Sequence, residues 1–170
     1  GFAEYVFIHE FGHHFAGLAD EYYTSDVAYE TGAAYHPEPW EPNVTALHDP
    51  AGVKWGDLIG VDVPVPTPWD KDLFEAGSVA AQQKRRGLRA DGAPETAMDE
   101  LFTEQMERET ALLGGMEHAG TVGAFEGASY EPTGLYRPEV DCIMFTRNPV
   151  GFCRVCSRAI ERVIDLYARP

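Results

Sequence analysis

Apolar side chains occur on nearly every side of residues 2–18, a pattern that predicts a buried helix at the start of the chain. At the other end, residues 153–168 carry apolar side chains along one side only, which predicts an amphipathic helix. Residues 94–113 have an acidic start, a largely apolar stripe and two glycines after the last turn. This combination is typical of a surface helix whose stripe contacts the core.

The segments between these helices are less regular. Residues 71–90 are weakly helical, whereas residues 60–66 are extended, alternate in polarity and predict an edge strand protected by its prolines. Four prolines exclude long helices from residues 19–52, which are expected to form an irregular loop. Short strands are expected at 122–125 and 143–145, among turn-forming residues. We therefore predict an α+β fold.

Size and charge restrict the class of protein. The chain has 170 residues, the length of one domain, and 44% of them are apolar, which is enough for a core. Its net charge of −15 argues against binding to nucleic acid or to an anionic membrane surface. No apolar stretch approaches the about 20 residues of a membrane span. The composition suits a soluble extracellular protein.

The first helix contains a motif that carries chemistry, His9-Glu10-Phe11-Gly12-His13, which reads H-E-x-x-H. Residues four apart share a helix face, so both imidazoles can reach one metal ion. Glu10 lies beside them and can contact a water bound to that ion. This is the division of labour in zinc peptidases, where the glutamate is the general base. The alternative is two ordinary histidines on a helix with a solvated glutamate.

A third ligand is expected just after this helix. Gly17 is a natural helix end because glycine adopts the left-handed conformation without strain. A chain that turns there can bring Asp20 back to the metal, an arrangement similar to the glycine turn and third ligand of metzincins. Glu21 is the neighbouring competitor. Both acids could also be solvated, or bind a structural cation together with Glu30, but a plain surface loop is the simpler interpretation of this segment.

A distant methionine fits the same arrangement. Metzincins carry a tight turn with a methionine beneath the metal site, far downstream of the helix. Met144 occupies a corresponding place in the sequence. Taken alone it would be an ordinary core methionine, but together with the helix motif we interpret it as the residue of a methionine turn.

The chain has three cysteines, Cys142, Cys153 and Cys156. The C-x-x-C spacing of the last two is compatible with a metal site or a redox pair. A structural zinc site needs four ligands, and the sequence holds no second cysteine pair, although a histidine could complete the set. The favoured interpretation is a disulfide from Cys142 to Cys153 or Cys156, which would tie the methionine turn to the last helix.

With these motifs the chain resembles the bacterial IgA-peptidase-type metallopeptidases, family sixty-four of the metallopeptidases. The resemblance covers roughly residues 1–66 and 120–165, in matching order. Its matching segments run through residues 9–13, 18–22, 41–45, 54–55, 125–130, 136–138, 142–144 and 152–156.

The resemblance implies a zinc metalloendopeptidase with a metzincin-like catalytic domain, exported from a bacterial cell to the surface, the periplasm or the medium. It implies that His9 and His13 bind Zn²⁺ and that Glu10 is the base, whereas Asp20 as third ligand rests on spacing. The substrate would be a protein or peptide. A phenol from Tyr130 or Tyr136, both near Met144 in sequence, could stabilise the oxyanion, and Arg147 could line a primed-side pocket with an acidic or polar preference.

Two features depart from the family pattern. Residues 70–121 are longer and less regular than expected, and the chain starts almost at the active-site helix, without the sheet that precedes it in metzincins. We therefore expect a partial catalytic domain. The alternatives are a non-catalytic module that binds protein or carbohydrate on a truncated peptidase fold, and a metal-dependent hydrolase that does not cut peptides. The sequence does not indicate an oligomeric state.

Overall fold

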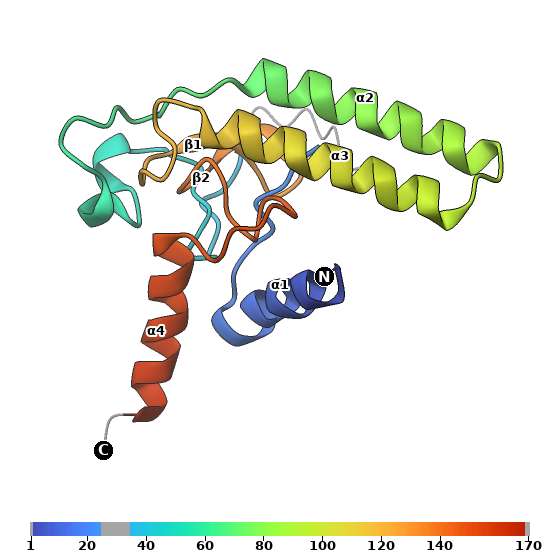
Figure 1. Cartoon of the computed structure of the whole chain (residues 1–170). Helices are drawn as coiled ribbons and strands as arrows, with labels where there is room; N and C mark the ends of the chain where they lie inside the picture. Colours follow the sequence, from blue (N-terminus) through green and yellow to red (C-terminus); the bar gives the residue numbers. More distant parts are fainter. Residues whose placement is uncertain (1, 25–34, 169–170) are drawn as a thin grey trace.

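The computed structural model describes residues 2–24 and 35–168, so Glu30 lies outside the described residues. Within these two ranges, four helices and one hairpin form the fold, together with short 3₁₀ turns at Pro50–Gly52 and Gly56–Leu58. In Figure 1 the helices α2 and α3 run side by side along one edge of the molecule, and α1 and α4 lie on the opposite side of the hairpin. The helices are α1 (Phe2–Ala16), α2 (Lys71–Ala90), α3 (Glu95–Gly114) and α4 (Arg154–Ala168), and the strands are β1 (Phe125–Ala128) and β2 (Glu131–Arg137).

This mixed architecture confirms the α+β prediction, and each predicted helix is present with ends that differ by at most two residues. The strands were predicted less well. The segment 60–66 forms turns and bends rather than a strand, and Val61 is 100% exposed. Its prolines lack the N–H groups that a strand needs. Residues 143–145 form a turn, and the first strand starts at Phe125, three residues later than expected.

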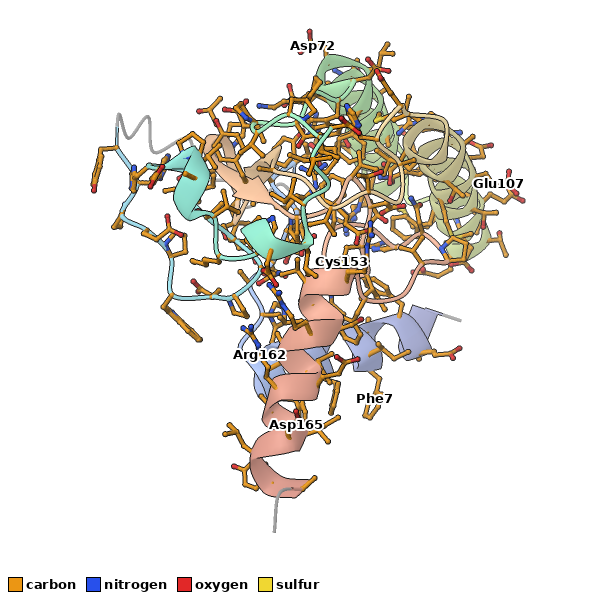
Figure 2. The ribbon with its side chains drawn as sticks, turned by 90° about the vertical axis from the view of Figure 1, so that its left-hand side faces the viewer. Phe7, Asp72, Glu107, Cys153, Arg162 and Asp165 are labelled. Carbon is orange, nitrogen blue, oxygen red and sulfur yellow. The ribbon has the colours of Figure 1, made fainter. Side chains whose placement is uncertain are left out.

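The burial predicted for the first helix is wrong. Only the side of α1 that carries His9 and Gly12 is buried, while Phe7 is 74% exposed. Figure 2 shows Phe7 pointing away from the body of the molecule. Gly12 explains the close approach on the packed side, because a Cβ there would lie 2.9 Å from the Phe152 ring and 3.0 Å from the sulfur of Met144. The apolar composition of the helix therefore overstated its burial.

Helix α1 ends as the sequence predicted. Gly17 has a φ of +62°, a left-handed conformation that favours glycine. The amides of Gly17 and Leu18 donate to the carbonyls of His13 and Gly12, which satisfies the last turn. The chain then runs on without regular structure to Thr24, past Asp20.

The core lies between the hairpin, the segment before α4 and the inner faces of α2 and α3. Its largest fully buried apolar side chains are those of Trp55, Phe125, Leu113 and Met144. The stripe of α3 is buried at Leu101 and Glu109, and Leu112 at its end packs against the core, as predicted. Among the described residues, no helix is both long and apolar enough to cross a bilayer.

A buried cation joins the hairpin to the rest of the core. Arg137 is 0% exposed, and its guanidinium carbon lies 3.8 Å from the centre of the Phe145 ring and 4.3 Å from that of Trp69. Its N–H groups donate to the carbonyls of Glu126, Gly127 and Val140. Burial lowers the pKa of Arg137 to about 10, which still leaves it charged at neutral pH. The side chain thus connects β1 to the segment that follows β2.

The cysteines do not form the predicted disulfide. All three are free and buried thiols. The sulfurs of Cys142 and Cys156 lie 3.9 Å apart, against about 2.05 Å for a disulfide bond. The physical reason is that the three thiols surround a fourth polar group, the carboxylate of Glu21, instead of pairing.

Replacing Arg137 tests its role in stability. Arg137→Met should lower the free energy of unfolding by about 3 kcal/mol, because three buried carbonyls lose their donors while the removal of a buried charge offsets part of the loss. Denaturant unfolding followed by circular dichroism measures the change. The matched control is Arg162→Met on the exposed part of α4, visible in Figure 2, where a change within about 0.5 kcal/mol is expected. Equal stability of the two variants would contradict the assignment.

Candidate metal centre

Three polar atoms converge where α1 meets the segment that follows it. The helix places His9 and His13 one turn apart, with their Nε2 atoms 3.0 Å from each other. Asp20 Oδ1 lies 3.0 Å from Nε2 of His9 and 3.1 Å from Nε2 of His13. The structure thus brings together the three residues that the sequence singled out, in a nearly equilateral triangle of donor atoms.

Hydrogen bonds on the far side of each ring determine where its proton lies. His9 Nδ1 is 3.0 Å from the carbonyl oxygen of Ile143, and His13 Nδ1 is 2.6 Å from that of Leu18. Because a carbonyl oxygen only accepts, each Nδ1 must carry the hydrogen. In the neutral rings the two Nε2 lone pairs then face each other and a carboxylate oxygen, an arrangement that repels unless a cation lies between them.

The triangle fits a metal ion. Metal-binding histidines usually donate the other ring N–H to a carbonyl or carboxylate, as both rings do here. Zinc–nitrogen and zinc–oxygen bonds of about 2.0–2.1 Å give tetrahedral edges of about 3.3–3.4 Å. The observed edges of 3.0–3.1 Å are slightly shorter than these.

The carboxylate of Asp20 is held ionised. Burial alone would raise its pKa, but the close contacts with the rings of His13 and His9 and the hydrogen bond from Tyr130 outweigh this and hold the pKa well below its usual range. Conversely, the hydrogen bond to Asp20 raises the pKa of His13.

The turn between β1 and β2 delivers Tyr130 to Asp20. Ser129 and Tyr130 have φ values of 51° and 66°, as a two-residue type I′ hairpin turn requires, although that turn usually contains Asn and Gly. Their amides donate to the carbonyls of Asp20 and Tyr22, and both donor–acceptor distances are 3.0 Å. The Tyr130 hydroxyl in turn donates to Asp20 Oδ2. The strained turn is thus compensated by contacts that position the third candidate ligand.

The two tyrosines predicted for the site have different positions. Tyr130 is in the site, whereas the phenol of Tyr136 interacts with Glu126 on the neighbouring strand. The register explains this, because β2 pairs Tyr136 with Glu126 and bridges it to Thr45, away from the turn. The prediction for Tyr136 is therefore not supported.

Sequence reasoning missed two other tyrosines. The Tyr22 hydroxyl lies 2.9 Å from that of Tyr130, and the Tyr22 ring stacks on His9 with centroids 6.2 Å apart. The Tyr5 hydroxyl lies 3.4 Å from His9 Nδ1. Tyr5 precedes His9 by four residues on the helix, a spacing that could have identified it.

The choice between Asp20 and Glu21 follows from local geometry. Successive side chains of an extended segment point to opposite sides. Asp20 faces the histidines, whereas Glu21 is 0% exposed, accepts a hydrogen bond from Asn43 and faces the cysteines. Burial raises the pKa of Glu21. The structure therefore groups Asp20, not Glu21, with the two histidines.

The segment around Met144 forms a tight turn under α1. The amides of Phe145 and Thr146 both donate to the carbonyl of Cys142, and Met144 sits in the middle, fully buried against Gly12. Its carbonyl accepts from the amide of Glu21 over 2.8 Å. The turn thus lies against the helix face between the two histidines, where the sequence predicted a methionine turn.

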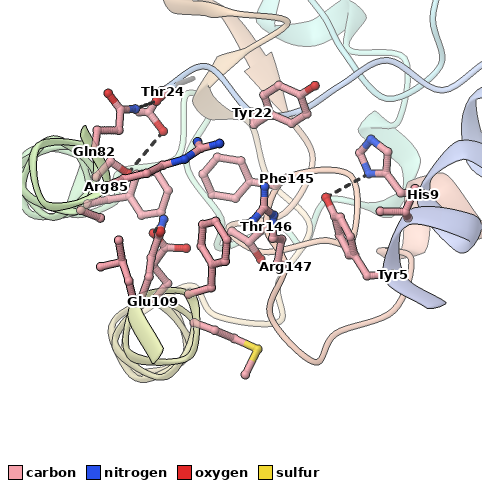
Figure 3. Close-up of a pocket in the computed structure, with 18 of the residues that line it drawn as sticks. Tyr5, His9, Tyr22, Thr24, Gln82, Arg85, Glu109, Phe145, Thr146 and Arg147 are labelled. Carbon is pink, nitrogen blue, oxygen red and sulfur yellow. Dashed lines mark hydrogen bonds between the residues drawn. The ribbon is translucent and has the colours of Figure 1, made fainter. Parts of the chain in front are cut away.

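A cavity of about 470 Å³ opens beside this site. Figure 3 shows Tyr5, His9 and Tyr22 on one side of it and Arg85 and Glu109, from α2 and α3, on the other. Arg147 and Phe145 lie between the two sides, and the exposed Glu10 also lines the cavity. Of the three candidate ligands, His9 therefore adjoins a space that can receive part of a substrate.

The sequence matches a known family over almost its whole length. The profile described as IgA Peptidase M64 covers residues 1–164, which include the helix motif, the hairpin, the methionine turn and all three cysteines. This chain belongs to the IgA peptidase M64 family. The resemblance noted from the motifs is thereby confirmed, and membership indicates a peptidase, which acts on proteins or peptides. A comparison with curated proteins gives no match to this M64 peptidase.

Metal binding should depend on pH through His13. The pKa of His13 is raised above the usual histidine value of about 6.5. As the pH falls, a metal ion therefore has to displace a proton from His13 at a higher pH than it would from an ordinary histidine. The apparent affinity for Zn²⁺ should therefore be constant at high pH and fall about tenfold per pH unit below that pKa. Competition with a chelator between about pH 5 and 8 measures it. His14→Ala, at an exposed neighbouring histidine, should leave the profile unchanged, and a flat profile in the native chain would contradict the geometry.

Proposed function

We propose that this M64 peptidase is a zinc-dependent endopeptidase whose Zn²⁺ is held by His9, His13 and Asp20. The observation that carries the proposal is the convergence of two Nε2 atoms and a carboxylate oxygen whose outward hydrogen bonds leave their lone pairs facing one another. Three protein ligands of nitrogen and oxygen are typical of catalytic zinc sites, which keep one position open. The glycine end of α1 and the turn at Met144 support a metzincin-like arrangement.

Zinc in such a site polarises a peptide carbonyl and lowers the pKa of a coordinated water to about 7. Glu10 is the general base in this proposal. It follows His9 on α1, is exposed and lines the cavity, so its carboxylate can take the proton of the attacking water and pass it to the leaving amine. The histidines and Asp20 are already bound to neighbours, which suits them to holding rather than moving protons.

The tyrosines divide into two roles. Tyr130 donates to Asp20 Oδ2, and burial together with this carboxylate raises its pKa, so it stays a protonated donor that positions Asp20. Tyr22 lines the cavity beside His9, and burial raises its pKa as well. We assign to Tyr22 the hydrogen bond that stabilises the developing oxyanion.

The exported bacterial location expected from the family resemblance is part of the proposal. A net charge of −15 is compatible with it. No observation on the described residues favours the non-catalytic alternative.

Replacing Glu10 separates metal binding from catalysis. Glu10→Gln should keep the zinc content of the native chain and lower kcat by about 10²–10⁴-fold, because the amide cannot accept the proton of the water. The measurements are elemental analysis and cleavage of a casein or peptide-library substrate. Glu4→Gln, at an exposed position of the same helix, is the matched control and should retain activity. Full activity of Glu10→Gln would exclude the mechanism, and zinc binding without cleavage by the native chain would favour a binding module.

The cavity also predicts a substrate preference. Arg147 and Arg85 both line it and lie near the Phe102 ring, with the Arg147 guanidinium carbon 5.0 Å and the Arg85 guanidinium carbon 5.7 Å from the ring centre. A carboxylate of the substrate would gain a charge-assisted hydrogen bond there, worth about 1.5–3 kcal/mol. Arg147→Gln should therefore lower kcat/KM about tenfold or more for peptides with Glu near the cleaved bond, and much less for the same peptides with Gln. An equal loss for both series would show that Arg147 does not select charge.

A further inference from the structure

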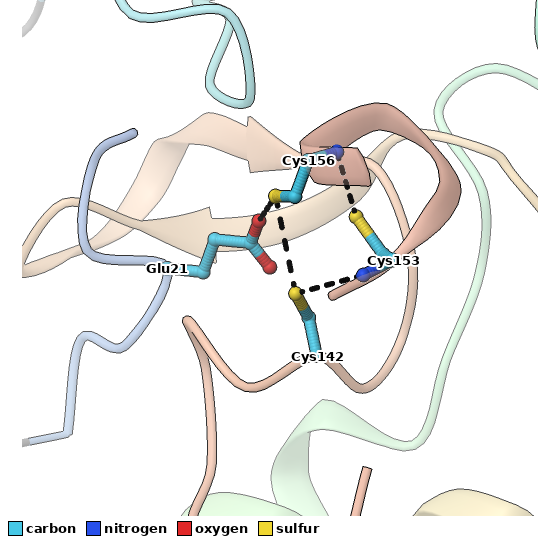
Figure 4. Close-up of side chains that lie close together, drawn as sticks. All are labelled: Glu21, Cys142, Cys153 and Cys156. Carbon is cyan, nitrogen blue, oxygen red and sulfur yellow. Dashed lines mark hydrogen bonds between the residues drawn. The ribbon is translucent and has the colours of Figure 1, made fainter. Parts of the chain in front are cut away.

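A second cluster of potential metal ligands lies on the other side of Asp20 from the histidines. It consists of the thiols of Cys142, Cys153 and Cys156 and the carboxylate of Glu21, all of them buried. Figure 4 shows the four side chains, from three separate segments, pointing toward one another. Their ligand atoms all lie within 4.8 Å of each other. The cluster takes no part in the proposed hydrolysis.

We propose that these four residues bind a second zinc ion, which is structural. The distances agree with a zinc tetrahedron. Bonds of about 2.3 Å to sulfur and 2.0 Å to oxygen give edges of about 3.8 Å between two sulfurs and about 3.5 Å between sulfur and oxygen. The Cys142 and Cys156 sulfurs are 3.9 Å apart, and the Cys156 sulfur is 3.3 Å from Glu21 Oε1.

The backbone around the thiols favours their anionic, metal-binding form. Cys153 immediately precedes α4 and Cys156 lies in its first turn, so both occupy the positive end of the helix dipole. The amide of Cys153 donates to the sulfur of Cys142 over 3.3 Å, and the amide of Cys156 to the sulfur of Cys153 over 3.5 Å. Donors of this kind stabilise thiolates. The C-x-x-C pair is thus placed as in a metal knuckle, with Cys142 supplied by the methionine turn.

The environment of the Glu21 carboxylate is the observation that indicates a bound ligand. Its Oε1 accepts from Asn43 Nδ2 over 2.9 Å, but its Oε2 is fully buried and has no hydrogen-bond partner among the described residues. An unpartnered buried carboxylate oxygen is costly. A metal ion among the thiols that is bound by Oε2, or by both carboxylate oxygens, would provide the missing partner, and the amide of Asn43 already holds Oε1 in place.

The donor set selects the metal and its role. Thiolates favour zinc over magnesium or calcium. Four protein ligands close a tetrahedral site and leave no position for a substrate, which is the mark of a structural centre. Such an ion would connect the segment after α1, the methionine turn and α4. Because Asp20 and Met144 lie on two of these segments, the second zinc would stiffen the base of the catalytic centre.

The two sites can be separated by variants and by spectroscopy. The native chain should contain about two zinc ions, and the double variant His9→Ala/His13→Ala should retain about one. When Co²⁺ replaces zinc in both proteins, each should show thiolate-to-cobalt charge-transfer absorption in the near ultraviolet. Cys153→Ser should weaken or abolish that band while Glu10→Gln, which leaves the cluster intact, should keep it. Glu21→Gln should lower the affinity for the retained ion.

The native chain alone decides the question if the variants do not fold. Absence of the charge-transfer band from the cobalt-substituted native protein would overturn the proposal. So would titration of one thiol rather than three in the denatured, unreduced chain, because it would reveal a disulfide. A band that persists in a protein without peptidase activity would leave the second zinc established and reject only the proposed function, so the two failures are distinguishable.

Discussion

The two hydrogen bonds by which His9 and His13 donate outward, to the carbonyls of Ile143 and Leu18, are the constraint on which the site depends. Helix periodicity supplies only the spacing of the two rings. The carbonyls fix the tautomer and the rotation of each ring, and so direct both Nε2 atoms toward Asp20. One carbonyl belongs to the methionine turn and the other to the residue after the glycine helix end, so the chemistry of the centre follows from how these segments pack against α1.

The short segment from Asp20 to Tyr22 contacts the histidines, the cysteine cluster, the methionine turn and the hairpin turn. Its side chains alternate, so Asp20 and Tyr22 face the histidines while Glu21 faces the thiols. Its main chain is held on both sides, by the carbonyl of Met144 and by the hairpin turn at Tyr130. A shift of this segment would move the third candidate ligand and the carboxylate of the cysteine cluster together. The integrity of each site therefore depends on the other.

How much was predictable depended on how local each feature is. The pair of histidines and the end of α1 at Gly17 followed from spacing and backbone preference, whereas the turn at Met144 was expected by analogy with metzincins; the structure contains all three features. Tyr130 could be separated from Tyr136 only by the register of the hairpin, which the sequence does not specify. The disulfide was predicted by considering only pairs of cysteines. Glu21, which lies among the three thiols in the structure, is distant from them in sequence, and no motif connects it to them. The exposed side of α1 was mispredicted for a similar reason, because the composition of a helix does not show which elements pack against it.

The contacts also explain why Glu10, among the acids near the centre, is suited to proton transfer. Asp20 contacts two histidine rings and accepts from a tyrosine, and these contacts keep its pKa low and its position fixed. Glu21 is fully buried and held by Asn43. A group bound in this way cannot pick up a proton and release it without breaking its contacts. Glu10 is exposed at the cavity, and its side chain has no hydrogen-bond partner among the described residues, so it can take up and release a proton without breaking a hydrogen bond of the site. In the proposed mechanism, the groups that position the site are thus separate from the group that exchanges a proton.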